Sequence, residues 1–302
     1  MLDVRRLRLL RELAHRGTIV AVADALAFTP SAVSQQLGVL EREAGVPLLE
    51  RTGRSVTLTP AGEHLVRHAE AVLERLEQAT AELAAARHGP AGPLRIGAFP
   101  TATRAIVPAA LAILATRHPA LEPMVSEIDP AAVADALRAG DLDVALVHEY
   151  DFVPAPAAPG IATAPLCGEV TYLASADSGD TTTTDDLRVL RRRRHSPWIT
   201  ATPGTLCHTM TVRACQAAGF QPRIRHRIDD FTTVLALVAA GQGVALVPQL
   251  GIVDPPADVH LTRLPIHRRT RIAHRRGAAI HPAVAAITDA LRAAVPDHLI
   301  AD

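Results

Sequence analysis

Residues 17–44, GTIVAVADALAFTPSAVSQQLGVLEREA, are the stretch that decides how the whole chain is organised. Thr18 can cap a helix over residues 19–26, because its hydroxyl can accept a hydrogen bond from a free backbone N–H. After a short turn, Thr29 and Pro30 give a second start signal, a capping hydroxyl followed by proline at the first helical position. Glycine at position 45 is a typical helix end. Two short helices joined by a tight turn predict a helix-turn-helix.

The second of these helices, residues 30–44, has two different faces. Val33, Leu37 and Leu40 lie on one side, and small polar residues share the other. Serine and glutamine can hydrogen-bond to base edges or phosphates, and Gly38 lets the backbone approach a groove. On an arbitrary helix such residues would simply be solvated. Within this pattern, the residues expected to face DNA are Thr29, Pro30, Ser31, Ser34 and Gln35.

The segments on either side complete the unit. Leucines in the first sixteen residues recur at three- and four-residue steps, which predicts a preceding helix. Residues 47–58 predict a hairpin of two short strands, which would form a wing. Arg51 and Arg54 lie near its tip, where arginines can neutralise phosphates or enter a minor groove. Two arginines at a turn are, on their own, more often solvated.

A long helix is expected from Pro60 to about His88, where Gly89-Pro90 ends it. Its apolar residues recur at alternating steps of four and three, a heptad pattern that favours a coiled-coil dimer. His64 and His68 have a spacing that could hold a metal, but no third ligand lies nearby in the sequence, so no metal site is predicted. The heptad seam consists of Leu65, Ala69, Val72, Leu76, Ala79, Leu83 and Ala86.

Beyond a Gly/Pro-rich hinge at 89–93, expected strands alternate with expected helices, which predicts an α/β architecture with a mostly parallel sheet. A Pro/Ala-rich connection at 153–159 separates two such sets. The expected strands are residues 94–98, 122–128, 143–147, 169–174, 198–201 and 244–247. Helices are expected after Thr101 and Thr205 and over residues 130–139, 185–191, 231–240 and 281–295.

Composition limits the class of protein. A chain of 302 residues, 48% hydrophobic, can bury a large core and hold about two structural units. No apolar run approaches the roughly 20 residues of a membrane span, and three cysteines do not suggest a disulfide framework. We therefore expect a cytoplasmic protein with no membrane partner. Residues 1–60 hold eight arginines and six acidic residues, an excess too small to indicate nucleic acid by itself.

The order and spacing of these motifs resemble the LysR-type family of bacterial transcriptional regulators along essentially the whole chain. The N-terminal matches are Gly17-Thr18, ADAL at 23–26, SAVSQQL at 31–37, Leu40-Glu41, GVPLLER at 45–51 and LTPAG at 58–62. Two further matches are LRAGDLDVAL at 137–146 and VAAGQGVALVP at 238–248. The chain departs from the family where Pro30-Ser31 replaces a frequent Gln-Pro and Gln35 stands where arginine is common. Base preference is therefore not carried over.

The resemblance implies a winged helix-turn-helix over residues 1–59, which is all-α with a small β wing, and a dimerising linker helix over 60–88. Residues 89–302 would form an effector-binding α/β domain with two lobes like those of periplasmic binding proteins. Lobe I would comprise about 91–161 and 268–302 and lobe II about 162–267, with crossings near 161–166 and 265–272. Members usually bind pseudo-palindromic double-stranded DNA as homodimers or homotetramers, and an activator would also contact RNA polymerase. The expected dimer contacts are Leu65, Ala69, Val72, Leu76 and Leu83.

A small-molecule effector is implied between the lobes, where helix N-termini offer free N–H groups that would suit an anion such as a carboxylate. Thr101 and Thr205 could equally serve only as helix caps. No spacing predicts a catalytic site, a metal or a cofactor, so we expect no enzyme. The implied effector contacts are Pro100, Thr101, Ala102, Thr103, His148, Thr202, Pro203, Gly204, Thr205, Phe231 and Thr232.

The sequence leaves alternatives open. The C-terminal two-thirds alone would suit a cytosolic small-solute binding protein. Cys207 and Cys215 are spaced similarly to the pair used by a peroxide-sensing branch of the family, which would make a redox-sensing regulator. Eight residues apart on one helix, they would lie about 12 Å apart, beyond the roughly 7 Å between Cα atoms that a disulfide allows. The arginine run at 191–194 could bind an anion, but a solvated run is the simpler interpretation.

Overall fold

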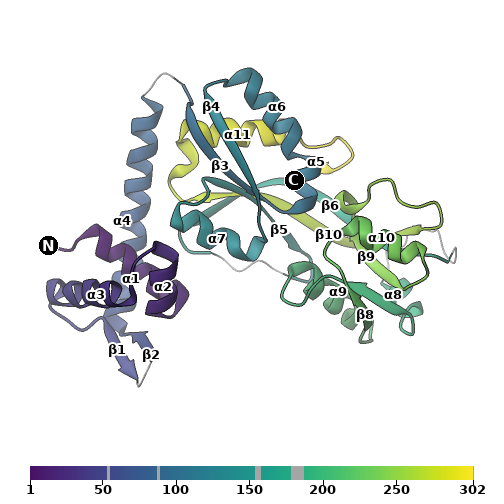
Figure 1. Ribbon diagram of the computed structural model, residues 1–302, viewed down its shortest axis with the longest axis horizontal. Helices are drawn as coiled ribbons and strands as arrows, with labels where there is room; N and C mark the ends of the chain where they lie inside the picture. The colour runs from purple at the N-terminus through teal and green to yellow at the C-terminus, as the bar shows by residue number, and fades with distance from the viewer. Residues whose placement is uncertain (53–54, 87–88, 154–157, 178–186, 302) are drawn as a thin grey trace.

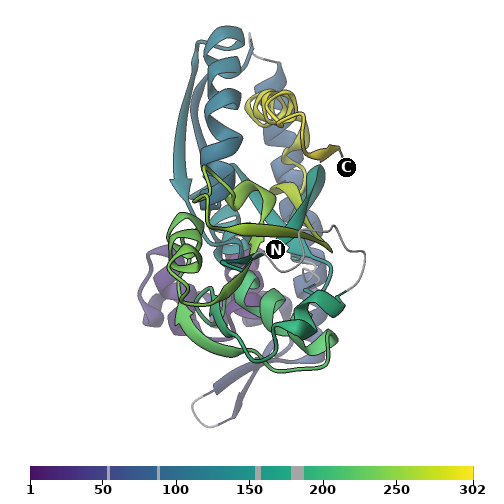
Figure 2. The same cartoon turned by 90° about the vertical axis from the view of Figure 1, so that its right-hand side faces the viewer.

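The computed structural model shows a small helical unit, one long helix and a larger two-lobed unit (Figures 1 and 2). The structure describes residues 1–52, 55–86, 89–153, 158–177 and 187–301. Arg54 at the expected wing tip, His88, most of the 153–159 connection and the start of the helix expected at 185–191 lie outside these residues. No described helix is long and apolar enough to cross a bilayer.

The N-terminal unit forms from the helix signals in the sequence. Thr18 and Thr29 accept hydrogen bonds from Ala21 N–H and Ala32 N–H, as N-caps do. Leucines and valines from the three helices then share one buried core. The elements are α1 (Val4–Arg16), α2 (Ile19–Leu26), α3 (Pro30–Ala44), β1 (Leu49–Thr52), β2 (Ser55–Leu58) and α4 (Pro60–Ala85).

The wing and α4 are fixed to α3 by local contacts. The Glu41 carboxylate accepts hydrogen bonds from the N–H groups of Leu48 and Leu49, both at 3.0 Å. Gly62, in the first turn of α4, lies directly against this segment, because a Cβ there would come 2.2 Å from the Leu48 carbonyl oxygen. The glycine therefore lets α4 start close beside the wing.

One sheet runs through both lobes, in the order β4-β3-β5-β10-β6-β9-β7-β8 with β11 beside β6. Its outer strands are parallel, but the central pairs β5–β10, β10–β6 and β6–β9 are antiparallel. The expectation of a mostly parallel sheet is thus wrong at the centre. The strands are β3 (Gly92–Ala98), β4 (Leu121–Glu127), β5 (Val144–Tyr150), β6 (Ile161–Ser175), β7 (Pro197–Thr200), β8 (Arg223–Arg227), β9 (Val244–Pro248), β10 (His260–Arg275) and β11 (Ile300–Ala301).

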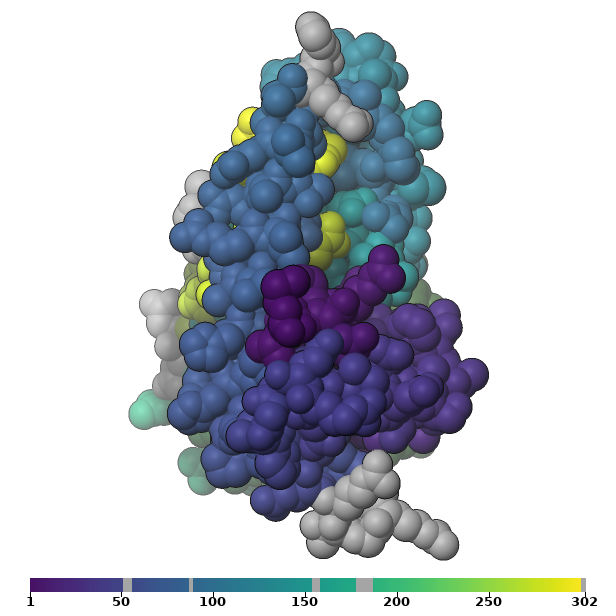
Figure 3. Space-filling view, turned by 90° about the vertical axis from the view of Figure 1, so that its left-hand side faces the viewer, coloured from purple at the N-terminus to yellow at the C-terminus, as the bar shows by residue number. Residues whose placement is uncertain are grey.

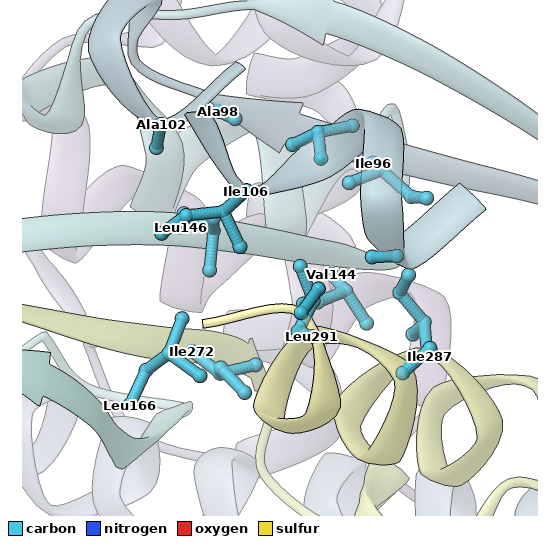
Figure 4. Packing of buried hydrophobic residues seen from close by; sticks show 14 of the residues in the cluster. Ile96, Ala98, Ala102, Ile106, Val144, Leu146, Leu166, Ile272, Ile287 and Leu291 are labelled. Atoms are coloured by element: carbon cyan, nitrogen blue, oxygen red, sulfur yellow. The ribbon is translucent and has the colours of Figure 1, made fainter. Parts of the chain in front are cut away.

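Helices cover the sheet in each lobe. In the first lobe, Ile96, Val144 and Ile272 from three strands pack against Ile287 and Leu291 of α11 (Figure 4). In the second lobe, a separate core forms around Trp198. The helices are α5 (Pro100–Ala105), α6 (Val107–Arg117), α7 (Pro130–Ala139), α8 (Arg188–Arg192), α9 (Leu206–Ala217), α10 (Phe231–Ala239) and α11 (Pro282–Ala293), with short 3₁₀ turns η1 (Gln249–Gly251) and η2 (Ala278–Ile280).

The strands β8 and β10 were not among the strands expected from the sequence. In β10, alternate residues from Thr262 to His274 are buried, but they include Arg268 and Thr270, so no apolar alternation marks the strand. β8 is an edge strand, and its charged residues are typical of edges that must not pair with other chains. Because polar and charged residues occupy many strand positions in β8 and β10, the sequence pattern does not predict either strand.

Candidate functional site

The outer face of α3 carries the residues expected to face DNA. Thr29, Pro30, Ser31 and Gln35 are exposed and Ser34 is half-buried, so the five lie together near the start of the helix. The Thr29 and Ser31 hydroxyls lie 3.1 Å apart. By contrast, the neighbouring Gln36 side chain accepts a hydrogen bond from Arg6 Nε at 2.9 Å and is turned toward α1. Within this set, the Thr29 hydroxyl also caps α3, whereas Gln35 is exposed on the outer face of the helix.

Of the two wing arginines, Arg51 lies in β1 opposite Val56, and Arg54 lies outside the described residues. Figure 3 shows the helix-turn-helix at the lower part of one face, with α4 running up beside the lobes.

The heptad seam of α4 divides into two parts. Ala69 is fully buried in the core of its own helix-turn-helix, so its assignment as a dimer contact is wrong. Leu65 packs partly against the same core. Val72, Leu76 and Leu83 are 38%, 46% and 73% exposed. Large apolar side chains in a row on an exposed helix indicate a surface that another molecule covers.

A pocket of about 340 Å³ lies between the two lobes, where the first residues of four helices meet β5 and β10. Five of the expected effector contacts line it: Pro100, Thr101, His148, Thr205 and Phe231. The other six do not: Ala102, Thr103, Thr202, Pro203, Gly204 and Thr232. Lining residues that sequence reasoning missed include Arg104, Asp129, Ala201, Cys207, Asp230 and Arg268.

Local packing explains why several of these residues lie outside the pocket. Ala102 faces the core of the first lobe, and the Thr103 hydroxyl donates to the Phe99 carbonyl at 3.2 Å. Thr202 is held by Asp229, which accepts from both its N–H and its hydroxyl. Asp129 and Asp230 precede predicted helix starts, so a capping signal was present for both. Nothing in the sequence indicates that Arg268 lines the pocket, because the strand that contains it, β10, is not predicted.

The floor of the pocket is a row of buried polar residues on the central strands. Arg268 pairs in register with Tyr150 on one side and Glu169 on the other. Its guanidinium lies 2.6 Å from Glu169 Oε1 and donates to Thr101 Oγ1 at 2.9 Å. Burial opposes the charge of Arg268, but Glu169 outweighs it and raises the pKa of the guanidinium. The Arg268 guanidinium therefore stays charged, and its bonds to Glu169 and Thr101 hold the crossing strands against the first lobe.

His148 is the least satisfied group on this floor. It is 5% exposed, and neither ring nitrogen has a hydrogen-bond partner among the described residues. Its ring lies edge-on to Phe99 at 4.6 Å and to Tyr150 at 5.3 Å between centroids. Burial, and then the charge of Arg268, lowers its pKa well below the usual value. A neutral imidazole offers one donor and one acceptor, which a bound molecule could use.

The charges around the pocket do not favour a simple anion. Arg104 and the already paired Arg268 are outnumbered by Glu127, Asp129, Asp229 and Asp230. Some of the N–H groups expected to be free for an effector also already have partners within the chain. Three helix starts are capped by side chains of the chain itself, namely Asp129 on α7, Thr205 on α9 and Asp230 on α10.

Comparison with known proteins then decides the family. Residues 4–63 match the bacterial regulatory helix-turn-helix protein of the lysR family, and residues 87–296 match the LysR substrate binding domain. The chain belongs to the LysR family of transcriptional regulators. The regulator TfdS of Cupriavidus pinatubonensis is 34% identical to it over 254 residues, 82% of each chain. The nitrogen assimilation regulatory protein nac of Klebsiella aerogenes is 30% identical over 254 residues, 82% of this chain and 79% of its own.

Solved structures of LysR-family regulators share the full-length fold. A cysteine variant of full-length OxyR from Pseudomonas aeruginosa has a TM-score of 0.60 and 25% identity and covers 98% of this chain and 99% of its own. Full-length CbnR in complex with its target DNA has a TM-score of 0.55 and 25% identity, covering 97% of this chain and 100% of its own. The architecture is thus shared with a regulator seen on DNA.

The cysteines of this LysR-family chain are poorly placed for redox chemistry. Cys207 and Cys215 both lie on α9, where eight residues span about 12 Å. Cys207 lies 3.3 Å from the Tyr150 hydroxyl, and Cys215 is fully buried. Burial raises the pKa of both thiols, that of Cys215 to about 12. Because the thiolate is the reactive form, the raised pKa lowers the reactivity of both thiols.

Proposed function

We propose that this regulator reads double-stranded DNA through the exposed end of α3 and that a small molecule in the interlobe pocket controls the reading. The observation that carries the proposal is the outer face of α3, where the small polar residues Ser31 and Ser34 and the exposed Gln35 lie within about two helical turns of Gly38. Such a face suits close approach to base edges. The role requires binding and movement of domains but no chemical step, so we propose no enzymatic activity.

The pocket supports control by a small organic molecule. Its volume of about 340 Å³ lies within the usual range for ligand sites, roughly 300–1,000 Å³. Phe99, Ile128 and Phe231 supply apolar walls, while His148 and Thr101 supply hydrogen-bonding groups on the floor. The surrounding carboxylates favour a neutral or zwitterionic effector over a simple anion.

The exposed seam of α4 supports assembly with a second copy, as a homodimer or a tetramer of two such pairs. Val72, Leu76 and Leu83 would pack against the same residues of the partner, because a two-fold interface brings identical patches together. Two α3 helices would then face two half-sites of a pseudo-palindromic operator.

Selection of duplexes from a random DNA pool by the full-length protein tests the proposal. We expect an enriched pseudo-palindromic motif whose binding weakens steeply with salt, since arginine contacts to phosphates release counterions. Ser34→Glu, which places a negative charge on the reading face, should abolish enrichment while the protein remains folded by circular dichroism. A pool that shows no enriched sequence would instead favour a small-solute binding protein.

Redox sensing is the second candidate, because OxyR structures are among the similar ones and Cys207 lines the pocket. One of these, a cysteine-to-serine variant of OxyR of Corynebacterium glutamicum with bound hydrogen peroxide, has a TM-score of 0.59, is 27% identical, and covers 97% of this chain and 92% of its own. The raised pKa of both thiols argues against this candidate. Mass spectrometry after peroxide treatment decides the question: a Cys207–Cys215 link would support it, and its absence would remove it.

A further inference from the structure

Helix α7 connects the interlobe pocket to the helix-turn-helix. Asp129, its N-cap, and Pro130, its first residue, line the pocket. Its other end, at Arg138 and Ala139, contacts Arg8 of α1, and Figure 1 shows α7 on the side of the first lobe that faces the helix-turn-helix. At ten residues, it spans about 15 Å. One rigid helix therefore lines the pocket with its first residues and contacts α1 with its last turn.

The α1 helix holds the last turn of α7 directly. Arg8 Nη2 donates to the carbonyl oxygens of Arg138 at 3.1 Å and of Ala139 at 3.0 Å. These carbonyls belong to the helix C-terminus, where unpaired acceptors and the helix dipole both favour a cation.

A chain of ion pairs runs alongside this contact. Glu12, fully buried in α1, binds Arg11 at 2.6 Å and Arg16 at 2.9 Å. Arg16 also reaches Asp135 of α7 at 3.3 Å, and Asp135 binds Arg138 at 2.8 Å. Burial opposes the ionisation of Glu12, but Arg11 and Arg16 outweigh it and hold its pKa below the usual value. We call the contacts of Arg8 and Arg16 with α7 the clasp.

The clasp joins two units that keep separate cores. The apolar cluster of the helix-turn-helix includes Leu10, Leu37 and Leu40, and that behind α7 includes Val133 and Leu137. No residue of the described chain belongs to both clusters. Interfaces between domains that are polar, without a shared core, permit relative movement. Opening of the clasp therefore disrupts neither apolar cluster, while α4 keeps its own contact with the first lobe through the Glu77–Arg275 pair at 2.9 Å.

We propose that α7 transmits the state of the pocket to the helix-turn-helix through the clasp. In the arrangement seen here, the clasp is closed and holds α1 against the first lobe. A molecule that displaces the first turn of α7 moves its last turn under Arg8 and Arg16, and the clasp opens. This inference rests on the proposed function, because it describes how the same pocket regulates DNA reading.

Two matched capping variants test the direction from pocket to clasp. Asp129 and Asp230 are both aspartate N-caps that line the pocket, but only the helix capped by Asp129 reaches α1. Hydrogen exchange of the free full-length protein should be about fivefold faster at α7 amides 137–139 and in the last turn of α1 in Asp129→Ala. Asp230→Ala should leave both segments unchanged. Faster exchange confined to the first turn of α7, or equal effects of the two variants, would overturn the proposal.

The reverse direction uses arginine variants. Arg16→Ala should speed exchange at amides 131–133, at the pocket end of α7. The control is Arg67→Ala, whose guanidinium hydrogen-bonds to the Glu63 carbonyl of its own helix and makes no ion pair among the described residues. Asp135→Asn, which keeps the side-chain shape, gives a second disruption should Arg16→Ala fold poorly. No change at 131–133 in either variant would contradict coupling. Because exchange is measured without DNA, this outcome is separate from the DNA selection that tests the proposed function.

Discussion

His148 shows how one buried side chain links stability to a binding site. In the folded chain its pKa lies below the unfolded value, so as pH falls below about 6.5 the unfolded chain takes up the extra proton first. The free energy of unfolding should therefore decrease below that pH, by up to about 1.4 kcal/mol per pH unit for one proton.

His148→Phe removes this proton uptake, so its unfolding free energy should fall less than that of the wild-type chain between pH 7.5 and pH 5.5. Urea unfolding at the two pH values measures the difference. Equal losses in both proteins would show that the histidine is not held neutral in the folded state.

Gln35 and Gln36 are adjacent but should behave differently. Gln35 is exposed on the outer face of α3, whereas Gln36 accepts the hydrogen bond from Arg6. Gln35→Ala should relax base preference at one operator position, by about 1–3 kcal/mol. Gln36→Ala should instead lower the free energy of unfolding by about 1 kcal/mol and keep the preference. Competition binding against single-base operator variants separates the two, and equal loss of preference would contradict the orientation of α3.

At this scale, the sequence predicts residues whose role is local and misses those whose role depends on distant partners. Thr18 and Thr29 cap the helices they precede, as their position indicates. The role of Arg268 depends on Glu169 and Thr101, which lie 99 and 167 residues away, so no local pattern could reveal it. The isolation of both His148 nitrogens is likewise a property of the folded strands.

Among the elements, α3 and α4 each contain a glycine, and the two glycines have opposite surroundings. A Cβ at Gly62 would collide with the Leu48 carbonyl oxygen at 2.2 Å, whereas one at Gly38 would meet only Arg42 Nη1 at 4.0 Å. Gly62→Ala should lower the free energy of unfolding by about 1–3 kcal/mol, as overpacking does. Gly38→Ala should raise it by about 0.5–1 kcal/mol, since alanine favours a helix.

Chemical denaturation of both glycine variants measures these changes. Gly38→Ala should also weaken DNA binding, because the added methyl group lies on the reading helix. A stabilised variant with undiminished DNA affinity would show that α3 does not approach the groove at this point.

Helices were more predictable than strands for a physical reason. Capping residues and proline mark helix starts within a few residues, and the bounds of α2, α3 and α7 follow those marks. The crossing strand β10 is stabilised by pairing with β5 and β6, more than a hundred residues away for much of its length. Its alternate buried positions mix leucine and isoleucine with arginine, threonine and histidine, so its sequence shows no continuous apolar alternation.

At the scale of the whole molecule, the exposed seam of α4 predicts a dimer that one charge should break. Leu76→Asp should convert a particle of about twice the chain mass of 32.0 kDa into a monomer, because it places a carboxylate in an apolar interface. Ala71→Asp puts the same residue on α4 outside the seam and should leave the mass unchanged. Light scattering after size-exclusion chromatography gives the mass, and a dimer that survives Leu76→Asp would place the interface elsewhere.

The docking of the helix-turn-helix on the first lobe could not be predicted from sequence. The residues Arg8, Arg16 and Asp135 are single charges far apart in the chain, and each would pass for a solvated surface residue. The heptad pattern, by contrast, predicts a surface for a partner. The structure shortens that surface, because Ala69 is buried in the core of its own chain. Patterns within one element are visible in sequence, and contacts between units are not.

The spacing of the two half-sites is the measurement that tests most directly whether this chain acts as one half of a paired DNA reader. Affinity of the full-length protein would be measured on the selected operator and on variants with about 5 or about 10 base pairs inserted between the half-sites. We expect about half a helical turn to abolish tight binding and a full turn to restore part of it, because two linked α3 helices must face one side of the duplex. Equal affinity for all three spacings would contradict the account.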